Sequence, residues 1–289
     1  MAFGQHQTFY LRQQWLSKGM KELIDNSRFF YEVDHFEKLG VGKNMAKSIR
    51  HWLVATGVVN EMRKTRVEHE ITTFGKLIWK YDRFMQDPVT LSLLHYHLVT
   101  DENNATAWYW YHNLHSERVF SKQSLMDELT KWVKENYPRE VSVNSIKRDI
   151  DCLIQLYGKK DYVKLTPEDV IKSPLEDLLL LKQTTTTNYI KNEIQHDKMI
   201  ELLYLTLLLY AEKHNVKEIS LNELVNGAEL IGKVYNLSRV SIIEYIEELT
   251  SQYPVKFIQT NRLDVIRIEA SHTFAEALQQ YYERSEVHA

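Results

Sequence analysis

The stretch FEKLGVGKNMAKSIRHW, residues 36–52, joins a glycine turn to the start of an amphipathic helix. Apolar residues after the glycines recur at helical spacing: Met45, Ile49, Trp52 and Leu53. This period predicts a helix over residues 43–56 with one apolar face. The Trp52 ring is expected in the core.

The same helix carries cations on a different face. Lys43, Lys47 and Arg50 follow each other at i, i+4 and i+7, so they project to one side. Gly40 and Gly42 suit a sharp turn before the helix, and a helix N-terminus offers free N–H groups to an anion. The pattern is typical of the second helix of a helix-turn-helix. The alternative is a solvated basic face on an ordinary amphipathic helix.

A phosphate-binding P-loop fits this stretch poorly. Such a loop needs Gly, four residues, Gly, Lys and then Ser or Thr. Gly42 and Lys43 fit the later positions, but Glu37 takes the place of the first glycine and Asn44 that of the hydroxyl residue. A carboxylate would repel phosphate, and the missing hydroxyl removes a magnesium ligand.

Composition indicates an ordered, helix-rich chain. Its 289 residues suffice for two or three small domains, 44% of them are hydrophobic, and only 9 are Gly and 5 Pro. The single cysteine, Cys152, excludes an intramolecular disulfide and favours a reducing compartment. No apolar run is long enough to span a bilayer. We therefore expect a cytoplasmic protein without a membrane partner.

Charge is distributed unevenly along the chain. The net charge is −3, yet residues 1–80 carry 13 Lys and Arg against 8 Asp and Glu, whereas residues 193–289 carry 9 against 15. This asymmetry predicts that the two ends meet different partners. The basic end suits phosphate, and the acidic end suits protein or water.

One layout of helices followed by β structure occurs three times. We predict a mainly α chain with small β-hairpins, built of tandem winged-helix-like modules. The predicted units are a basic domain at 1–86, a helical aromatic connector at 87–120, a helix-turn-helix-like domain at 121–192 and an acidic domain at 193–289.

Several details follow from local patterns. Thr72, Thr73 and Gly75 suggest the turn of a hairpin, and a second hairpin is centred on residues 260–262. The helix at 142–157 is expected to place Asp149 on its polar side. The helix at 238–251 is expected to bury Val240 and to expose carboxylates that repel phosphate: Glu244, Glu247 and Glu248.

Motifs for catalysis are weak. His112 and His115 are spaced so that a helix could bring them together, but no Cys pair or zincin pattern assists them. The nearest group of carboxylates is Asp82, Asp87, Asp101 and Glu102. We expect no metal site from spacing alone. The aromatic run Trp108–Tyr111 is expected in the core rather than stacked on bases.

Five segments resemble a family of uncharacterised domains that accompanies bacterial DNA phosphorothioation genes, with SspB-like members. They are FGQHQTFYLRQQWLSKG (3–19), LGVGKNMAKSIRHW (39–52), DPVTLSLLHYHL (87–98), TAWYWYHN (106–113) and SVNSIKRDIDCLI (142–154). The matched positions in the first two segments are Phe3, Gly4, His6, Thr8, Phe9, Leu11, Arg12, Trp15, Lys18, Gly19, Gly40, Gly42, Lys43, Asn44, Arg50 and Trp52.

The resemblance implies a component of a DNA modification and anti-phage defence system. Its implied partners are double-stranded DNA, an ATPase, a cysteine desulfurase and a sulfurtransferase. It also implies DNA nicking before sulfur insertion, in which case Mg²⁺ is the expected cofactor; it supplies no catalytic residue. His6 and Thr8 are expected to cap the first helix.

The candidate DNA-binding residues combine both lines of argument: Gly42, Lys43, Asn44, Lys47 and Arg50, with Arg12 and Lys18 supporting the same phosphate surface. Three functions compete at this point. They are a DNA-binding subunit of the modification system, a metal-dependent nicking endonuclease, and a winged-helix transcription regulator without enzymatic activity.

Overall fold

The computed structural model describes residues 1–63, 65–159, 172–259 and 263–286. Its N-terminal elements are α1 (Trp15–Asp25), η1 (Phe29–Tyr31), α2 (His35–Lys38), α3 (Lys43–Ala55), β1 (Val59–Arg63), β2 (Val67–Ile71), α4 (Thr73–Tyr81), α5 (Pro88–Val99), α6 (Thr106–Tyr109) and η2 (Trp110–Leu114). The middle elements are β3 (Val119–Ser121), α7 (Lys122–Asn136), α8 (Val143–Tyr157), η4 (Pro174–Leu178), β4 (Leu181–Gln183) and β5 (Asn188–Lys191). The C-terminal elements are α9 (Met199–His214), β6 (Glu218–Ser220), α10 (Leu221–Asn226), α11 (Ile231–Val234), α12 (Arg239–Gln252), β7 (Val255–Gln259), β8 (Asp264–Ile268) and α13 (Phe274–Glu286).

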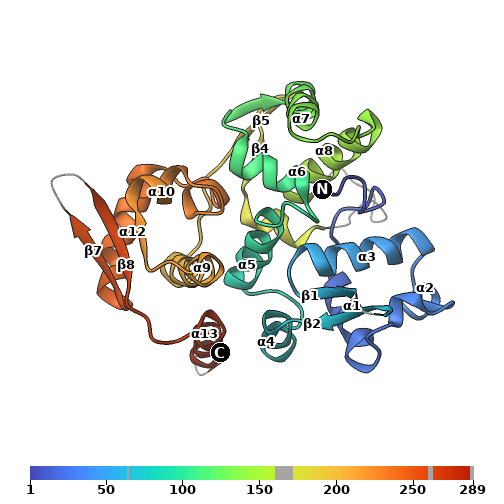
Figure 1. Ribbon diagram of the computed structural model, residues 1–289, viewed down its shortest axis with the longest axis horizontal. Coiled ribbons are helices and arrows are strands. Elements are labelled where there is room, and N and C mark those ends of the chain that lie inside the picture. The colour runs from blue at the N-terminus through green and yellow to red at the C-terminus, as the bar shows by residue number, and fades with distance from the viewer. Residues whose placement is uncertain (64, 160–171, 260–262, 287–289) are drawn as a thin grey trace.

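Helices dominate, and small antiparallel sheets accompany them (Figure 1). The predicted fold class, mainly α with small β-hairpins, is confirmed. In the described residues, no helix has the length and apolarity that crossing a membrane requires.

The first hairpin lies upstream of the predicted one. Strand β2 pairs with β1, with Val59 opposite Ile71. The predicted turn at Thr72–Gly75 is wrong, because the Thr72 side chain accepts a hydrogen bond from the Gly75 N–H at 3.0 Å and caps α4. Thr is a favoured N-cap residue, and this local bond starts a helix instead of a turn.

The other two sheets share one strand order. In β3-β5-β4 and in β6-β8-β7, the last strand along the chain lies between the first and the second. Helices α7 and α8 connect β3 to β4, and α10 to α12 connect β6 to β7. This repeated topology supports winged-helix-like modules, which remain an interpretation. The predicted turn at residues 260–262 lies outside the described residues.

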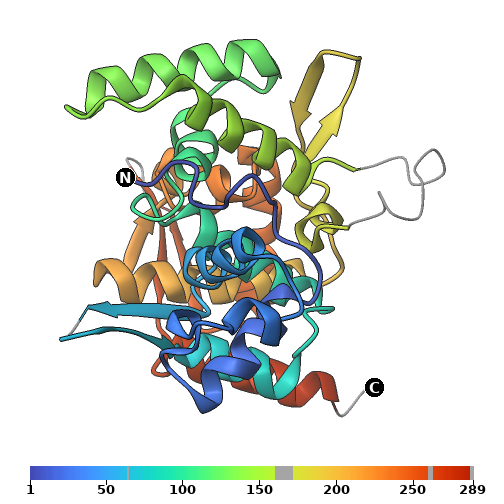
Figure 2. The ribbon, with the colours of Figure 1, turned by 90° about the vertical axis from the view of Figure 1, so that its right-hand side faces the viewer.

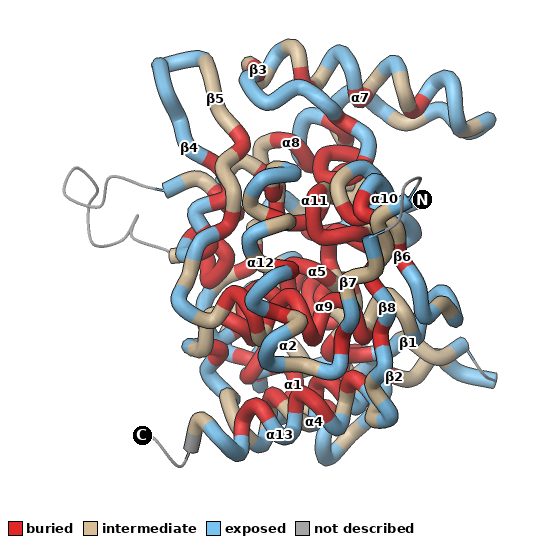
Figure 3. The backbone as a smooth tube through the Cα atoms, turned by 90° about the vertical axis from the view of Figure 1, so that its left-hand side faces the viewer, coloured by how far each residue is buried: buried red, intermediate tan, exposed pale blue. Residues whose placement is uncertain are grey.

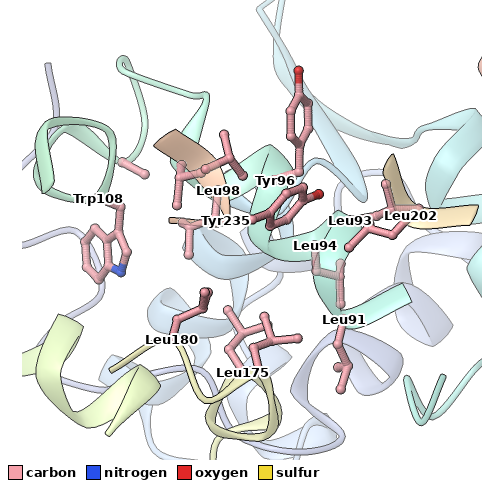
Figure 4. Packing of buried hydrophobic residues seen from close by; sticks show 14 of the residues in the cluster. Leu91, Leu93, Leu94, Tyr96, Leu98, Trp108, Leu175, Leu180, Leu202 and Tyr235 are labelled. Atoms are coloured by element: carbon pink, nitrogen blue, oxygen red, sulfur yellow. The ribbon is translucent and has the colours of Figure 1, made fainter. Parts of the chain in front are cut away.

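Helix α5 lies at the centre of the molecule and is buried around nearly its whole circumference. It packs against α9, α6 and η4, and Figure 4 shows its leucines among side chains of α6, α9 and the segments near η4 and α11. Helix α13 packs against α4 and α9. Buried residues, red in Figure 3, thus form one core that crosses every predicted domain boundary. The boundaries after residues 86, 120 and 192 remain predictions.

Two amphipathic faces differ from their predicted phase. Asp149 of α8 is only 1% exposed, so its predicted position on the polar side is wrong. Val240 of α12 is 66% exposed, while Ile242 is buried, so the predicted inward position of Val240 is also wrong. Val240 lies in the first turn of α12, which begins at Arg239, and the buried face of this helix is formed by Ile242, Ile246 and Leu249. Glu244, Glu247 and Glu248 are exposed as predicted.

Candidate nucleic-acid interface

Helix α3 enters through a glycine turn and packs one face into the core. Gly40 has φ +67°, a left-handed conformation that glycine adopts without a Cβ clash. Gly42 is the N-cap and makes no side-chain cap. The first N–H groups of the helix are therefore not occupied by a capping side chain, and an anion could accept from them. The element before this turn is helix α2, not a strand, so a P-loop is excluded.

The opposite side of α3 presents cations beside two aromatic rings, of which Phe36 is half-buried and Tyr31 is exposed. The Lys43 ammonium lies 5.0 Å from the centre of the Phe36 ring. The Arg50 guanidinium lies 5.6 Å from the centre of the Tyr31 ring and donates to its hydroxyl at 3.3 Å. Lys47 is exposed between them on the same helix face. Tyr31 is itself 43% exposed, which leaves its ring accessible at the surface.

The carboxylates of Glu32 and Asp34, which precede α3 in the chain, form ion pairs with Lys38 rather than with the cations of α3. Lys38 lies 2.7 Å from Glu32 and 3.3 Å from Asp34. In the described ranges, neither Lys43, Lys47 nor Arg50 is in an ion pair. The three cations are therefore available to phosphates.

The remaining predicted contacts lie apart from this face. Arg12 lies over the rings of Phe9 and Trp15, at 5.4 and 5.0 Å, and burial lowers its pKa. The Phe9 carbonyl accepts from Ser48 and Trp52, and at 3.6 residues per turn these positions lie roughly opposite the three cations. The structure thus does not bring Arg12 to the basic face.

Asn44 and Lys18 are both exposed. Asn44 follows Lys43 in the first turn of α3, while Lys18 belongs to α1. The contributions of Lys18, Asn44 and Arg12 to DNA binding remain predictions.

The N-terminal segment braces α3 against α8. His6 Nε2 lies 2.8 Å from Asp149 Oδ1, and the Gly4 N–H donates to the same oxygen at 2.7 Å. Figure 2 shows this segment, in dark blue, crossing between the green α7–α8 pair and the blue helices. The predicted capping role of His6 and Thr8 is wrong, because α1 begins only at Trp15 and its N-cap is Gln14.

Asp149 was missed as a structural partner, although its spacing held a signal. It lies three residues after Ile146 and four before Leu153, both of which are buried. Those positions share a helix face with Asp149. A carboxylate at the edge of an apolar stripe predicts a buried polar partner.

The other carboxylates and histidines support packing. Asp82 accepts from backbone N–H groups of Gln86 and Asp87, and Asp87 caps α5 and contacts Lys198 at 2.9 Å. Asp101 accepts from the backbone of Asn103 and Asn104. These carboxylates and Glu102 do not converge, and no three Asp, Glu, His or Cys side chains of the described residues form a possible metal site.

His95 illustrates how a buried imidazole is satisfied. Its Nε2 donates to the Val234 carbonyl at 2.8 Å, so Nδ1 accepts from the Tyr157 hydroxyl at 2.7 Å. Burial lowers its pKa to about 4, so the ring is neutral at pH 7. The run Trp108–Tyr111 is also mostly buried, as expected.

Three comparisons with known proteins bear on this fold. The family described as "Protein of unknown function (DUF4007)" matches residues 3–282. A crystal structure described as "Magnesium ion-bound SspB crystal structure" is 21% identical, with TM-score 0.85, and the match covers 98% of this chain and 88% of that one. A second, "SspB crystal structure", is 21% identical with TM-score 0.84 and 99% and 87% coverage. No curated protein sequence matches the chain.

Proposed function

Because the chain belongs to the DUF4007 family and shares its fold with SspB, we propose that it is the DNA-binding component of a bacterial DNA phosphorothioate modification system. The sequence resemblance to SspB-like proteins supports the system, with its ATPase, cysteine desulfurase and sulfurtransferase as partners. The observation that carries DNA binding is the exposed cationic face of α3.

Duplex DNA matches this face chemically. Lys43, Lys47 and Arg50 lie along about two turns of one helix and have no carboxylate partner among the described residues. Phosphate oxygens accept from such side chains and from free N–H groups at a helix start. These contacts position a protein on DNA without selecting a sequence. Binding through this face is therefore expected to be salt-dependent and weakly sequence-specific.

Changing Lys43, Lys47 and Arg50 together to Gln tests this directly. Each lost phosphate contact lowers the slope of log affinity against log salt by roughly 0.9, so the slope should flatten by about 2–3. Fluorescence anisotropy with a labelled duplex over a salt series measures it. The fold should remain intact, because exposed helix charges contribute only tenths of a kcal/mol.

A charge-matched control separates this face from bulk electrostatics. Lys131→Gln, Lys134→Gln and Arg139→Gln remove the same three charges from exposed positions in and after α7. This variant should keep the wild-type slope. Equal slopes in wild type and the α3 variant, with both proteins folded, would show that the face is only solvated surface.

Deleting residues 193–289 is not a usable test of which end binds DNA. Helix α9 packs against α5, and α13 packs against α4, so the deletion would expose the core. Changing Glu244, Glu247 and Glu248 to Gln leaves that core intact. DNA affinity within a few-fold of wild type would agree with a C-terminal portion that does not contact DNA.

Nicking of DNA is the finer form of this proposal. One solved relative is described as magnesium-bound, but the described residues of this chain do not fit a three-ligand metal site, so we derive no catalytic step through Mg²⁺. If the chain converts supercoiled plasmid to open circle, we expect a divalent cation to be required. The Cys152 thiol is buried and its pKa is raised by burial, so it is a poor nucleophile. Undiminished conversion in excess chelator, read on an agarose gel, would contradict this expectation.

A further inference from the structure

We propose that a small basic pocket between η2, β5 and α11 binds an oxyanion of the phosphate class. Its lining includes five side chains of the basic residue types: His112, His115, Arg118, Lys191 and Lys233. Its described lining contains no acidic residue, and Ser116 and Asn236 add hydrogen-bonding groups. This inference does not depend on DNA binding at α3.

Lys191 is the central feature of the pocket. It is 7% exposed, and its ammonium donates to the carbonyls of Tyr111 and His115, both at 2.7 Å. Among the described residues, its charge has no carboxylate partner. Buried charges in proteins are normally paired, because leaving water is costly for an ion. A bound anion would supply the missing counter-charge.

Two imidazoles in the pocket wall also lack partners. His112 and His115 are almost fully buried, and none of their ring nitrogens makes a hydrogen bond within the described chain. The closest carboxylate contact is Glu128 Oε2, 3.5 Å from His115 Nε2. Buried polar atoms without partners are rare and call for an explanation. A neutral imidazole has one N–H, which can donate to an oxyanion.

A π-helical turn presents these imidazoles. Residues 110–114 are π-helical, and the His115 N–H donates to the Trp110 carbonyl five residues earlier at 2.9 Å. Such turns are less stable than α-helical ones and occur frequently at functional sites. Here the wider turn places His112 and His115 in the same pocket wall. Lys191 of β5, almost 80 positions later in the chain, lines the same pocket.

The cavity volume narrows the ligand class. The pocket measures about 150 Å³. That space suits one tetrahedral oxyanion with some water, and it is smaller than pockets for drug-sized ligands, which begin at about 300 Å³. The ligand is thus free phosphate or sulfate, or a phosphate group projecting from a larger molecule.

Isothermal titration calorimetry with inorganic phosphate and with sulfate tests the pocket in the full chain. The variant Arg118→Gln/Lys233→Gln removes two surface cations from the wall and should weaken binding by at least about tenfold. The control Lys131→Gln/Lys134→Gln removes the same charge elsewhere and should bind like wild type. Melting temperatures and circular dichroism confirm that both are folded.

The pH dependence gives a second readout. Burial and, to a smaller extent, the nearby Lys233 charge lower the Lys191 pKa to about 7, although Glu128 acts to raise it. Burial lowers the pKa of His115 to about 3 and also lowers that of His112, so both imidazoles stay neutral over this pH range. Sulfate, whose charge is constant, should bind less tightly as pH rises through the Lys191 pKa. Lys191→Met should abolish both this trend and most of the binding.

Two further titrations distinguish the sources of the anion. A 5′-phosphorylated dinucleotide that binds more tightly than inorganic phosphate, beside an unphosphorylated one that does not bind, would assign the pocket to nucleic-acid ends. Comparable binding of phosphate and sulfate would assign it to free oxyanions. Absence of binding by all three anions at millimolar concentration, or binding that the Arg118/Lys233 variant leaves unchanged, overturns the proposal.

Discussion

Trp52→Ala should lower the free energy of unfolding by about 3–5 kcal/mol, the range for truncating a fully buried large aromatic residue. The Trp52 ring is 0% exposed and packs edge-to-face on Trp108, with ring centres 5.5 Å apart. Its Nε1–H donates to the Phe9 carbonyl at 3.0 Å. Truncation would leave a cavity and remove one of the two donors to the Phe9 carbonyl, which also accepts from Ser48.

Thermal and urea denaturation measure this loss. In chains somewhat shorter than this one, each kcal/mol of lost stability lowers the melting temperature by about 2–4 °C. A loss of about 3–5 kcal/mol should therefore lower the melting temperature by about 6–20 °C. Trp52→Phe keeps a ring and loses the N–H, so its loss should be smaller. Trp132→Ala is the matched control, because Trp132 is only half-buried. A Trp52→Ala melting temperature equal to that of wild type would exclude a core role for this ring.

The same variant tests how α3 is held for DNA. Trp52 joins α3 to both the N-terminal segment and α6, so the cations on the opposite face depend on its packing. DNA binding should weaken with the fraction of folded protein and recover at lower temperature. A salt slope unchanged in the folded fraction would agree with a supporting role for Trp52.

Asp149→Ala should cost about 3–5 kcal/mol, as expected when one partner of a buried polar pair is removed. The Asp149 carboxylate is the common acceptor for His6 and for the Gly4 N–H. Its loss would leave the buried His6 ring and the half-buried Gly4 N–H without their acceptor and would release residues 1–9 from α8. Denaturation measures the cost, and hydrogen exchange at Gly4 detects the release of the segment.

Asp149→Asn is the informative control. Its side-chain oxygen can still accept from Gly4 and His6, so the loss should be roughly 1 kcal/mol or less. Burial raises the pKa of Asp149, although His6 and Gly4 both act to lower it. An acid with a raised folded-state pKa contributes stability that is present below its unfolded pKa and is lost as pH rises through the folded pKa. The Asn variant should lack this pH-dependent loss, and a pH profile identical to wild type would contradict the assignment.

These contacts explain what the segment of residues 3–19, which resembles the family, does in the structure. Gly4, His6 and Phe9 all contact α3 or α8 rather than the exposed cationic face. Gly19 permits close packing of α1 on α3, because an added Cβ would lie 2.5 Å from the Leu53 side chain. Much of the motif therefore serves to hold α3, and Lys43, Lys47 and Arg50 remain the positions expected to meet DNA.

The sequence alone determined where most of the long helices lie, but not every local turn: Thr72 caps α4 rather than closing a hairpin. Helical period and capping residues fixed α3, α7, α8 and α12 to within a residue or two, because these signals act between positions at most four apart. The same spacing put Lys43, Lys47 and Arg50 on one face. The mainly α fold class followed from composition and pattern.

Only the tertiary structure decided the contacts between distant segments. It paired β2 with an upstream strand, placed Arg12 away from the cationic face and buried Asp149 against His6, 143 positions earlier. It also brought the Lys191 ammonium to the carbonyl of His115, which directly follows η2 and lies 76 positions earlier in the chain. Helical spacing defines which residues share a face, but not which distant segment covers it. That choice depends on how the whole core packs, since each buried polar group must find its partner there.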